Sequence, residues 1–137
     1  MKITFALIGI ATLTSIQLVF SQVPKKVVVE HFTNTNCSIC ASRNPGFYTN
    51  LHNQTGILHL AVHPSSPYPN CLLYQQNGTA NDARTNYYGI YGSTPRLVIN
   101  GNVISGGTNY SSSSIFTPYL GLTSPASIRI IQEKLNC

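Results

Sequence analysis

Two cysteines at a spacing suited to redox chemistry are the most informative residues of the sequence. Cys37 and Cys40 are separated by Ser38 and Ile39, and a stretch that favours a helix follows them. At a helix N-terminus the first sulfur lies beside unpaired backbone N–H groups and the positive end of the helix dipole, which favours the thiolate. The second sulfur lies one turn further on, where it can attack a mixed disulfide formed by the first. The pattern predicts thiol–disulfide exchange with Cys37 as the nucleophile and Cys40 as the resolving cysteine. An inert structural bridge and half of a zinc site are the alternatives.

The segments around this pair predict a strand-helix-strand unit that would position it. The run Lys26–Thr33 (KVVVEHFT) contains three consecutive valines and a phenylalanine, which suits a buried strand. We predict a helix over Ala41–Gln54, kinked at Pro45, and a second strand over Ile57–His63. Parallel strands need a crossover connection, usually a helix. We therefore expect an α/β fold in which the cysteines open the crossover helix.

The second half of the chain predicts an insertion, a hairpin and further helices. The predicted elements are an insertion at Pro64–Gly78 with a short helical piece near Leu72–Gln75, a helix at Thr79–Tyr88, strands at Arg96–Asn100 and Asn102–Ser105, a short helix near Ile115–Leu120, and a strand at Ser124–Ile131. Asn100-Gly101 is a strong signal for a tight hairpin. The order indicates a central mixed β-sheet flanked by helices, with the insertion between the second strand and the following helix. The last predicted strand is either an edge strand or the start of a second β domain.

The first twenty-one residues have the pattern of a secretion signal. Lys2 is followed by an uncharged run over Ile3–Phe20, and Val19 and Ser21 are the small residues expected before a cleavage site. We expect cleavage after Ser21, with an uncleaved N-terminal anchor as the alternative. One domain would follow at residues 22–123, with a tail at 124–137. The protein would then be exported to a compartment in which disulfides persist.

The composition excludes several classes of protein. Hydrophobic residues make up 42% of the chain, with 8 Tyr and 5 Phe, so it is not intrinsically disordered. Only 8% of the residues are charged, which excludes a coiled coil, because coiled coils need abundant Glu, Lys and Ala. The net charge of +5 arises mainly because there are only 3 acidic residues. The 8 lysines and arginines are spread along the chain and form no stripe, so we expect no nucleic-acid partner.

From Lys26 to about Gly107 the sequence resembles the thioredoxin superfamily. The resemblance rests on the apolar strand before the two cysteines, on Pro45 after them, and on the block Tyr88–Pro95 (YGIYGSTP) that leads into the hairpin. It implies a thioredoxin-like fold in which Pro95 is the cis-proline opposite the active site. It also implies that the backbone of Thr94 pairs with an extended substrate chain.

A closer similarity is to bacterial envelope thioredoxin-like proteins with a Glu-x-Phe-Thr motif before the cysteines. Glu30, Phe32 and Thr33 match that motif. The similarity implies a location in the periplasm or in association with the outer membrane. Such proteins often continue into a β-rich second domain, which would account for the strand predicted at Ser124–Ile131.

Several positions depart from the superfamily pattern or have an undecided role. Asn36 replaces a common tryptophan, and Ser38-Ile39 replaces a Gly-Pro that helps to set the redox potential. Arg96 follows Pro95, where it either lowers the pKa of Cys37 or is a solvated arginine at a strand end. His31 occupies the place of a buried acidic proton acceptor. It either accepts the proton of Cys40 or is a buried histidine without a catalytic role.

The remaining cysteines and histidines leave further alternatives open. If Cys37 and Cys40 pair, Cys71 and Cys137 are left to form a structural disulfide. Cys71 could otherwise be a free thiol or a further resolving partner. His59 and His63 could join the Cys37–Cys40 pair in a copper or zinc site, although the intervals match no common zinc framework.

The sequence thus predicts an exported thiol–disulfide oxidoreductase without a cofactor or a metal. Its partners would be protein thiols or disulfides and an upstream redox protein. Cys37, Cys40 and His31 are the candidate catalytic residues, and Thr94, Pro95 and Arg96 are the candidate substrate-binding residues. A redox-silent interaction domain of the cell envelope is the main alternative, and a metal-binding module is a weaker one.

Overall fold

The computed structural model describes residues 22–129 of the 137-residue chain. The predicted secretion signal and residues 130–137, which include Cys137, lie outside the described residues. Within residues 22–129 no helix is both long enough and apolar enough to cross a membrane.

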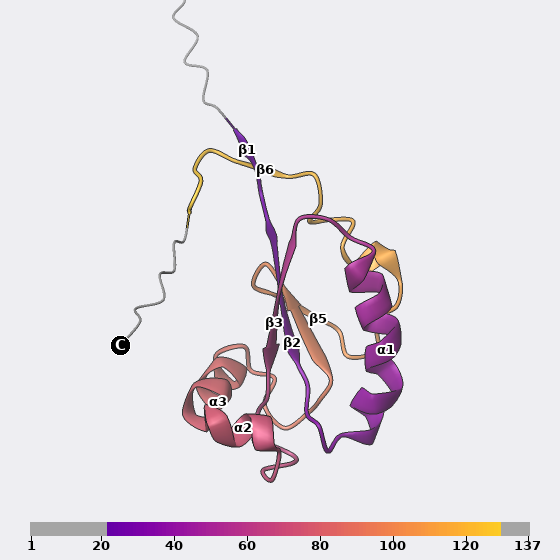
Figure 1. Cartoon of the computed structure of the whole chain (residues 1–137), viewed down its shortest axis with the longest axis vertical. Coiled ribbons are helices and arrows are strands. Elements are labelled where there is room, and N and C mark those ends of the chain that lie inside the picture. Colours follow the sequence, from indigo (N-terminus) through magenta and orange to yellow (C-terminus); the bar gives the residue numbers. More distant parts are fainter. Residues whose placement is uncertain (1–21, 130–137) are drawn as a thin grey trace, which may run out of the picture.

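A four-stranded mixed sheet forms the centre of the molecule (Figure 1). Its strands are β2 (Val27–Phe32), β3 (Ile57–Val62), β4 (Arg96–Ile99) and β5 (Asn102–Ile104), in the spatial order β3-β2-β4-β5. The parallel strands β2 and β3 pair in register from Val27 with Ile57 to Phe32 with Val62. They are joined through helix α1 (Ser38–His52), which confirms the predicted strand-helix-strand unit and places the cysteines at the start of its helix.

The other two strands form the predicted antiparallel hairpin. β4 pairs antiparallel with β2 and with β5. Between β4 and β5, Asn100 and Gly101 both adopt positive φ, of 48° and 83°. This is the conformation that a tight two-residue turn requires, and it is the reason that asparagine and glycine stand here.

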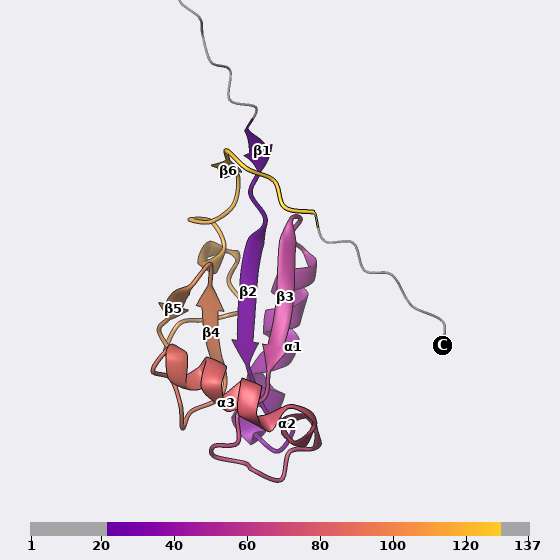
Figure 2. The ribbon, with the colours of Figure 1, turned by 90° about the vertical axis from the view of Figure 1, so that its left-hand side faces the viewer.

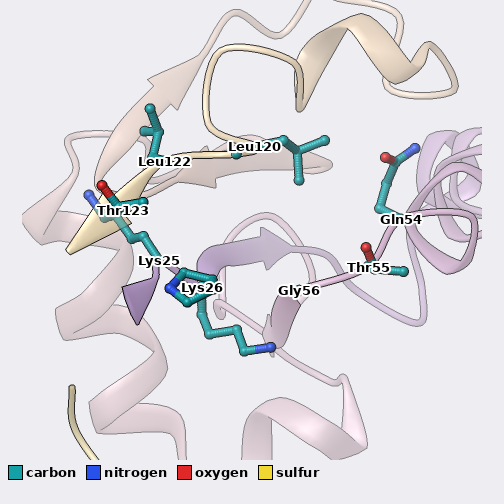
Figure 3. Close-up of a pocket in the computed structure, with 10 residues that line it drawn as sticks. Lys25, Lys26, Gln54, Thr55, Gly56, Leu120, Leu122 and Thr123 are labelled. Carbon is teal, nitrogen blue, oxygen red and sulfur yellow. The ribbon is translucent and has the colours of Figure 1, made fainter. Parts of the chain in front are cut away.

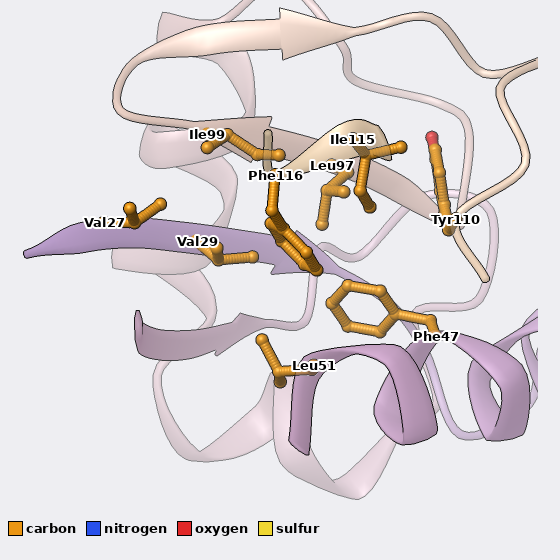
Figure 4. Close-up of a cluster of buried hydrophobic side chains, with 9 residues drawn as sticks. All are labelled: Val27, Val29, Phe47, Leu51, Leu97, Ile99, Tyr110, Ile115 and Phe116. Carbon is orange, nitrogen blue, oxygen red and sulfur yellow. The ribbon is translucent and has the colours of Figure 1, made fainter. Parts of the chain in front are cut away.

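Helices and loops cover the two faces of the sheet. α1 lies on one face, while α2 (Leu72–Gln76) and α3 (Gly78–Tyr87) lie on the other (Figures 1 and 2). The core on the α1 side gathers apolar side chains from β2, α1 and β4 and from the segment after β5 (Figure 4). These residues are Val27, Val29, Phe47, Leu51, Leu97, Ile99, Tyr110, Ile115 and Phe116. A smaller cluster on the α3 side consists of Phe32, Val62, Ile90 and Val98.

An ion pair between the buried Glu30 and the partly exposed Arg84 attaches α3 to the central strand. The guanidinium of Arg84 donates to both carboxylate oxygens of Glu30, at 2.6 and 2.8 Å. The hydroxyl of Tyr88 donates to the same carboxylate at 2.6 Å. Glu30 is only 3% exposed, so these donors compensate for the loss of water around its charge.

Two predicted elements near the C-terminal end are wrong in detail. The helix expected over Ile115–Leu120 is instead a single 3₁₀ turn, η1 (Ser113–Ile115), followed by turns. Pro118 explains the difference, because a proline disfavours helical geometry at the residue before it.

The strand expected over Ser124–Ile131 is likewise shorter in the described residues. Only Ser124 of that range is in a strand, as part of β6 (Thr123–Ser124), and Pro125 follows it at once. β6 pairs antiparallel with β1 (Val23–Pro24) in a separate two-stranded sheet and does not join the central one.

Candidate active site

The cysteine pair lies where β2 ends and α1 begins. Cys37 is the N-cap residue of α1, with extended backbone angles (φ −92°, ψ 110°), and its sulfur accepts the backbone N–H of Cys40 at 3.0 Å. The two residues form a disulfide with their Cα atoms 5.1 Å apart. The first turn of the helix contains no acidic residue. After reduction, the backbone donors of this turn would therefore favour the thiolate of Cys37.

The segment before β4 lies against the first cysteine. The Thr94–Pro95 peptide bond is cis, and the carbonyl oxygen of Thr94 lies 3.6 Å from Sγ of Cys37. Four of the residues predicted to form the site, Cys37, Cys40, Thr94 and Pro95, thus come from the two segments that meet here. Arg96 is placed differently, because its guanidinium donates to Ser93 Oγ at 3.3 Å and its side chain lies against Gly106. In this position Arg96 is half-buried beside the hairpin and makes no hydrogen bond to either cysteine.

His31 is fully buried on the face of β2 that packs against α1. Its ring lies 4.5 Å from the ring of Phe47 and 5.9 Å from that of His59, measured between centroids. Neither ring nitrogen has a hydrogen-bond partner. Burial lowers the pKa of His31 to about 3, with smaller contributions from the nearby His59 and His63, while the side chain of Asn44 acts in the opposite direction. His31 is therefore a neutral imidazole at physiological pH.

Two polar side chains, those of Asn44 and Thr33, lie near this histidine and contact each other. Asn44 comes one helical turn after Cys40, and its amide donates to Thr33 Oγ1 at 2.9 Å. The amide oxygen of Asn44 is buried without a partner, as are the nitrogens of His31. A cleft of about 350 Å³ opens beside them, lined by Thr33, Asn34, Thr35, Asn44, Tyr48, Ala61, His63 and Leu73. Water in this cleft would be able to reach the side chains of Thr33 and Asn44.

The insertion contributes Cys71 to the surroundings of the site. Cys71 forms no disulfide with any residue among 22–129, and it is fully buried. Its sulfur accepts the hydroxyl of Thr35 at 3.2 Å. Burial raises its pKa, but hydrogen bonds from Thr35 and from the backbone of Tyr74 and Leu73 outweigh this effect, so that the net pKa lies below the usual value.

Sequence reasoning did not identify Asn34, Thr35 or Asn44 as part of the site. Asn34 donates to Pro64 and Tyr68 of the insertion. These contacts join segments about 30 residues apart, and no local pattern predicts them. The one available signal was the cluster of turn-forming residues just before Cys37.

No metal centre forms around these residues. The described part of the chain contains no group of three or more His, Cys, Asp or Glu side chains placed to hold a metal ion. In particular, His59 lies near His31 rather than joining the cysteines.

Another cleft lies at the other end of the sheet (Figure 3). It measures about 550 Å³ and lies between the residues before β2, the turn before β3 and the segment Leu120–Thr123. β2 separates the two ends, and its six residues span roughly 20 Å. This cleft therefore does not contribute to the cysteine site.

Comparisons with known proteins add no assignment. No family model matches the chain, and no curated protein or solved structure shows significant similarity to it.

Proposed function

We propose that this protein is an exported thiol–disulfide oxidoreductase with a thioredoxin-like fold. The observation that carries the proposal is a Cys-x-x-Cys disulfide at the N-terminus of α1, with the sulfur of Cys37 against the carbonyl of Thr94. A mixed sheet with a parallel strand-helix-strand unit and an antiparallel hairpin is also what the resemblance to the thioredoxin superfamily implies.

The exchange reaction needs no group beyond two pairs of sulfurs. In the reductive direction, the Cys37 thiolate attacks a partner disulfide, and one partner sulfur leaves as a thiolate. The Cys40 thiolate then attacks Cys37, which closes the Cys37–Cys40 disulfide and releases the second partner sulfur. Two electrons have passed to the partner, and a dithiol donor must return them. With a dithiol partner and a disulfide acceptor, the same steps run in reverse.

The surroundings of the pair support a distinct role for each cysteine. Cys37 caps the helix and contacts Thr94, whose backbone would lie alongside an extended partner chain. Cys40 lies in the first turn of α1, one turn before Asn44, which lines the polar cleft. We assign His31 no part in proton transfer, because burial lowers its pKa to about 3 and its imidazole is then too weak a base to accept a thiol proton.

The alternative of a redox-silent interaction domain is favoured by one observation. Cys37 is 2% exposed and Cys40 is 1% exposed, so a partner sulfur has little direct access in this conformation. Under this alternative the disulfide would only stabilise the N-terminus of α1.

Catalysis of insulin reduction by dithiothreitol distinguishes the two functions. We expect the wild-type chain to accelerate the reaction and Cys37→Ser to reduce the rate to the uncatalysed background. Cys137→Ser is the matched control, because it removes one thiol and leaves the pair intact, and it should retain the wild-type rate. If the wild type has no more activity than Cys37→Ser, in both insulin reduction and the oxidation of a reduced protein, the redox-silent alternative is correct.

A further inference from the structure

Both cysteines of the disulfide are almost completely buried. Thiol–disulfide exchange requires an incoming sulfur to reach one sulfur of the pair, so access limits its rate. Cys37 is the N-cap residue of α1, in the connection that follows β2, yet only 2% of it is exposed. The loop that joins β3 to α2 lies at this same end of the sheet (Figures 1 and 2).

This loop, residues 64–71, contacts the segment immediately before Cys37. The side-chain amide of Asn34 donates to the carbonyl oxygens of Pro64 and Tyr68, both at 3.2 Å. Thr35 donates to the sulfur of Cys71 at 3.2 Å. Asn34 is in turn bonded to Cys37, whose backbone N–H donates to its carbonyl at 3.3 Å.

The same loop also contacts the segment on the other side of Cys37. The hydroxyl of Ser65 forms a hydrogen bond with that of Tyr91. Oγ of Ser66 lies 3.9 Å from the position that a Cβ atom on Gly92 would take. Gly92 stands two residues before Thr94, which contacts Cys37. The loop thus spans the two segments that flank the first cysteine.

We propose that residues 64–71 form a lid over the Cys37–Cys40 disulfide, and that the lid must open before a partner sulfur can react. The lid has no helix or strand of its own, and side-chain hydrogen bonds supply most of its anchors, which is typical of segments that open locally. Opening exposes the disulfide and the buried thiol of Cys71 together. That the lid admits a protein partner rests on the proposed function. Access to the disulfide can be measured with a small reductant, whatever the function is.

Asp82 is the anchor best suited to a test. From α3, its carboxylate accepts the backbone N–H of Ser65 at 2.8 Å, the Ser65 hydroxyl at 2.9 Å and the Tyr74 hydroxyl at 3.3 Å. It makes no hydrogen bond to the segment from Asn34 to Cys40. Asp82→Ala therefore releases the lid without altering the turn that holds the cysteines.

Two rates report the opening in oxidised full-length chains that carry Cys137→Ser, so that Cys71 is the single thiol. One is the reaction of Cys71 with Ellman's reagent, and the other is the reduction of Cys37–Cys40 by dithiothreitol. We expect Asp82→Ala to raise both rates by the same factor, on the order of tenfold, which corresponds to one anchor worth about 1.4 kcal/mol. Asn86→Ala, an exposed position one turn further along α3, is the matched control and should leave both rates unchanged.

Two outcomes overturn the lid. In the first, Cys71 reacts faster in Asp82→Ala while the reduction rate stays at the wild-type value, so that the loop opens without uncovering the disulfide. In the second, neither rate changes in a folded Asp82→Ala chain.

The Cys137→Ser chain with Asp82 intact covers the case in which Asp82→Ala does not fold. Both rates are then followed in urea below the unfolding transition, where they should rise with the same slope. A reduction rate that is independent of urea, beside a Cys71 rate that is not, also overturns the lid. Because dithiothreitol tests access alone, a chain that is inactive with insulin but shows coupled rates would reject the proposed function and keep the lid.

Discussion

At the scale of single residues, the most unusual group is a histidine buried without a hydrogen bond. An unpaired polar group in a core lowers stability, and both nitrogens of His31 are unpaired. The ring stays neutral because protonation would bury a positive charge beside Phe47 and His59, where little compensates for the lost hydration. His31 thus makes the stability of the fold sensitive to acid.

Replacing His31 should make the stability less dependent on pH. The histidine has a pKa of 6.5 when unfolded and about 3 when folded, so between these values the unfolded chain binds one more proton. The free energy of unfolding should therefore fall as the pH falls from 6.5, by up to about 1.4 kcal/mol per pH unit from this residue. In His31→Leu, urea denaturation between pH 7 and 4 should show a slope that is shallower by about this amount. The exposed His52, changed to Gln, is the control, and equal slopes in wild type and His31→Leu would refute the assignment.

At the scale of elements, two long-range contacts hold the helices on the sheet. One is the Glu30–Arg84–Tyr88 cluster, which attaches α3 to β2. The other is the contact of α1 with the loop after β5, where Asn50 donates to the carbonyls of Tyr110 and Ser112, both at 2.9 Å. The first contact carries a charge into the interior and so depends on pH as well as on geometry.

Loss of the Glu30 charge should weaken the attachment of α3. Glu30→Gln leaves Arg84 without its counter-charge, but the arginine side chain is 45% exposed and water can partly replace the carboxylate. We expect a loss of about 1–3 kcal/mol of stability, measured by urea unfolding at pH 7. Tyr88→Phe removes only the hydroxyl donor and should cost about 1 kcal/mol.

The pH dependence gives an independent check on the same cluster. The Arg84 side chain holds the pKa of Glu30 below its ordinary value of 4.5. The contribution of the ionised Glu30 to the free energy of unfolding is therefore complete above pH 4.5 and declines as the pH falls below that value. A Glu30→Gln chain as stable as the wild type at pH 7 would show that the cluster does not hold α3.

The hairpin turn offers a test of backbone conformation without any change in packing. Gly101 has φ of 83° and open space around it, so a Cβ atom there would meet nothing within 4 Å and only the backbone would be strained. Gly101→Ala should cost about 1 kcal/mol. Gly107→Ala, which is also in open space but not at positive φ, should cost less. Equal effects of the two changes on urea unfolding would contradict a strained turn.

At the scale of the whole molecule, local sequence patterns account for the central elements of the fold but not for the contacts between distant segments. The valine run of β2, the helix after the cysteines and the Asn100-Gly101 turn are local signals, and each element forms close to its predicted bounds. The pairing of β1 with β6 joins residues about 100 positions apart, and the Glu30–Arg84 contact joins residues 54 apart. Such contacts depend on how the elements pack, so no spacing rule predicts them.

The candidate site divides in the same way. The spacing of Cys37 and Cys40 predicted the disulfide, and the Thr94 carbonyl lies near Cys37, in the segment that the resemblance had indicated. The contacts of residues 64–71 with Asn34 and Thr35 could not be foreseen, because they depend on where a long insertion folds back. Under the proposed lid, these contacts control the access of a partner to the disulfide, and the Cys-x-x-Cys motif alone does not predict that access.

The central claim is that Cys37 attacks and Cys40 resolves, and trapping the intermediate tests it most directly. Cys40→Ser is incubated with a peptide disulfide, and the covalent adduct is located by mass spectrometry after digestion without reductant. We predict a mixed disulfide on Cys37 that persists in Cys40→Ser, is transient in the wild type and does not form in Cys37→Ser. An adduct confined to Cys71 or Cys137, or no adduct under conditions that reduce the wild-type pair, would contradict the account.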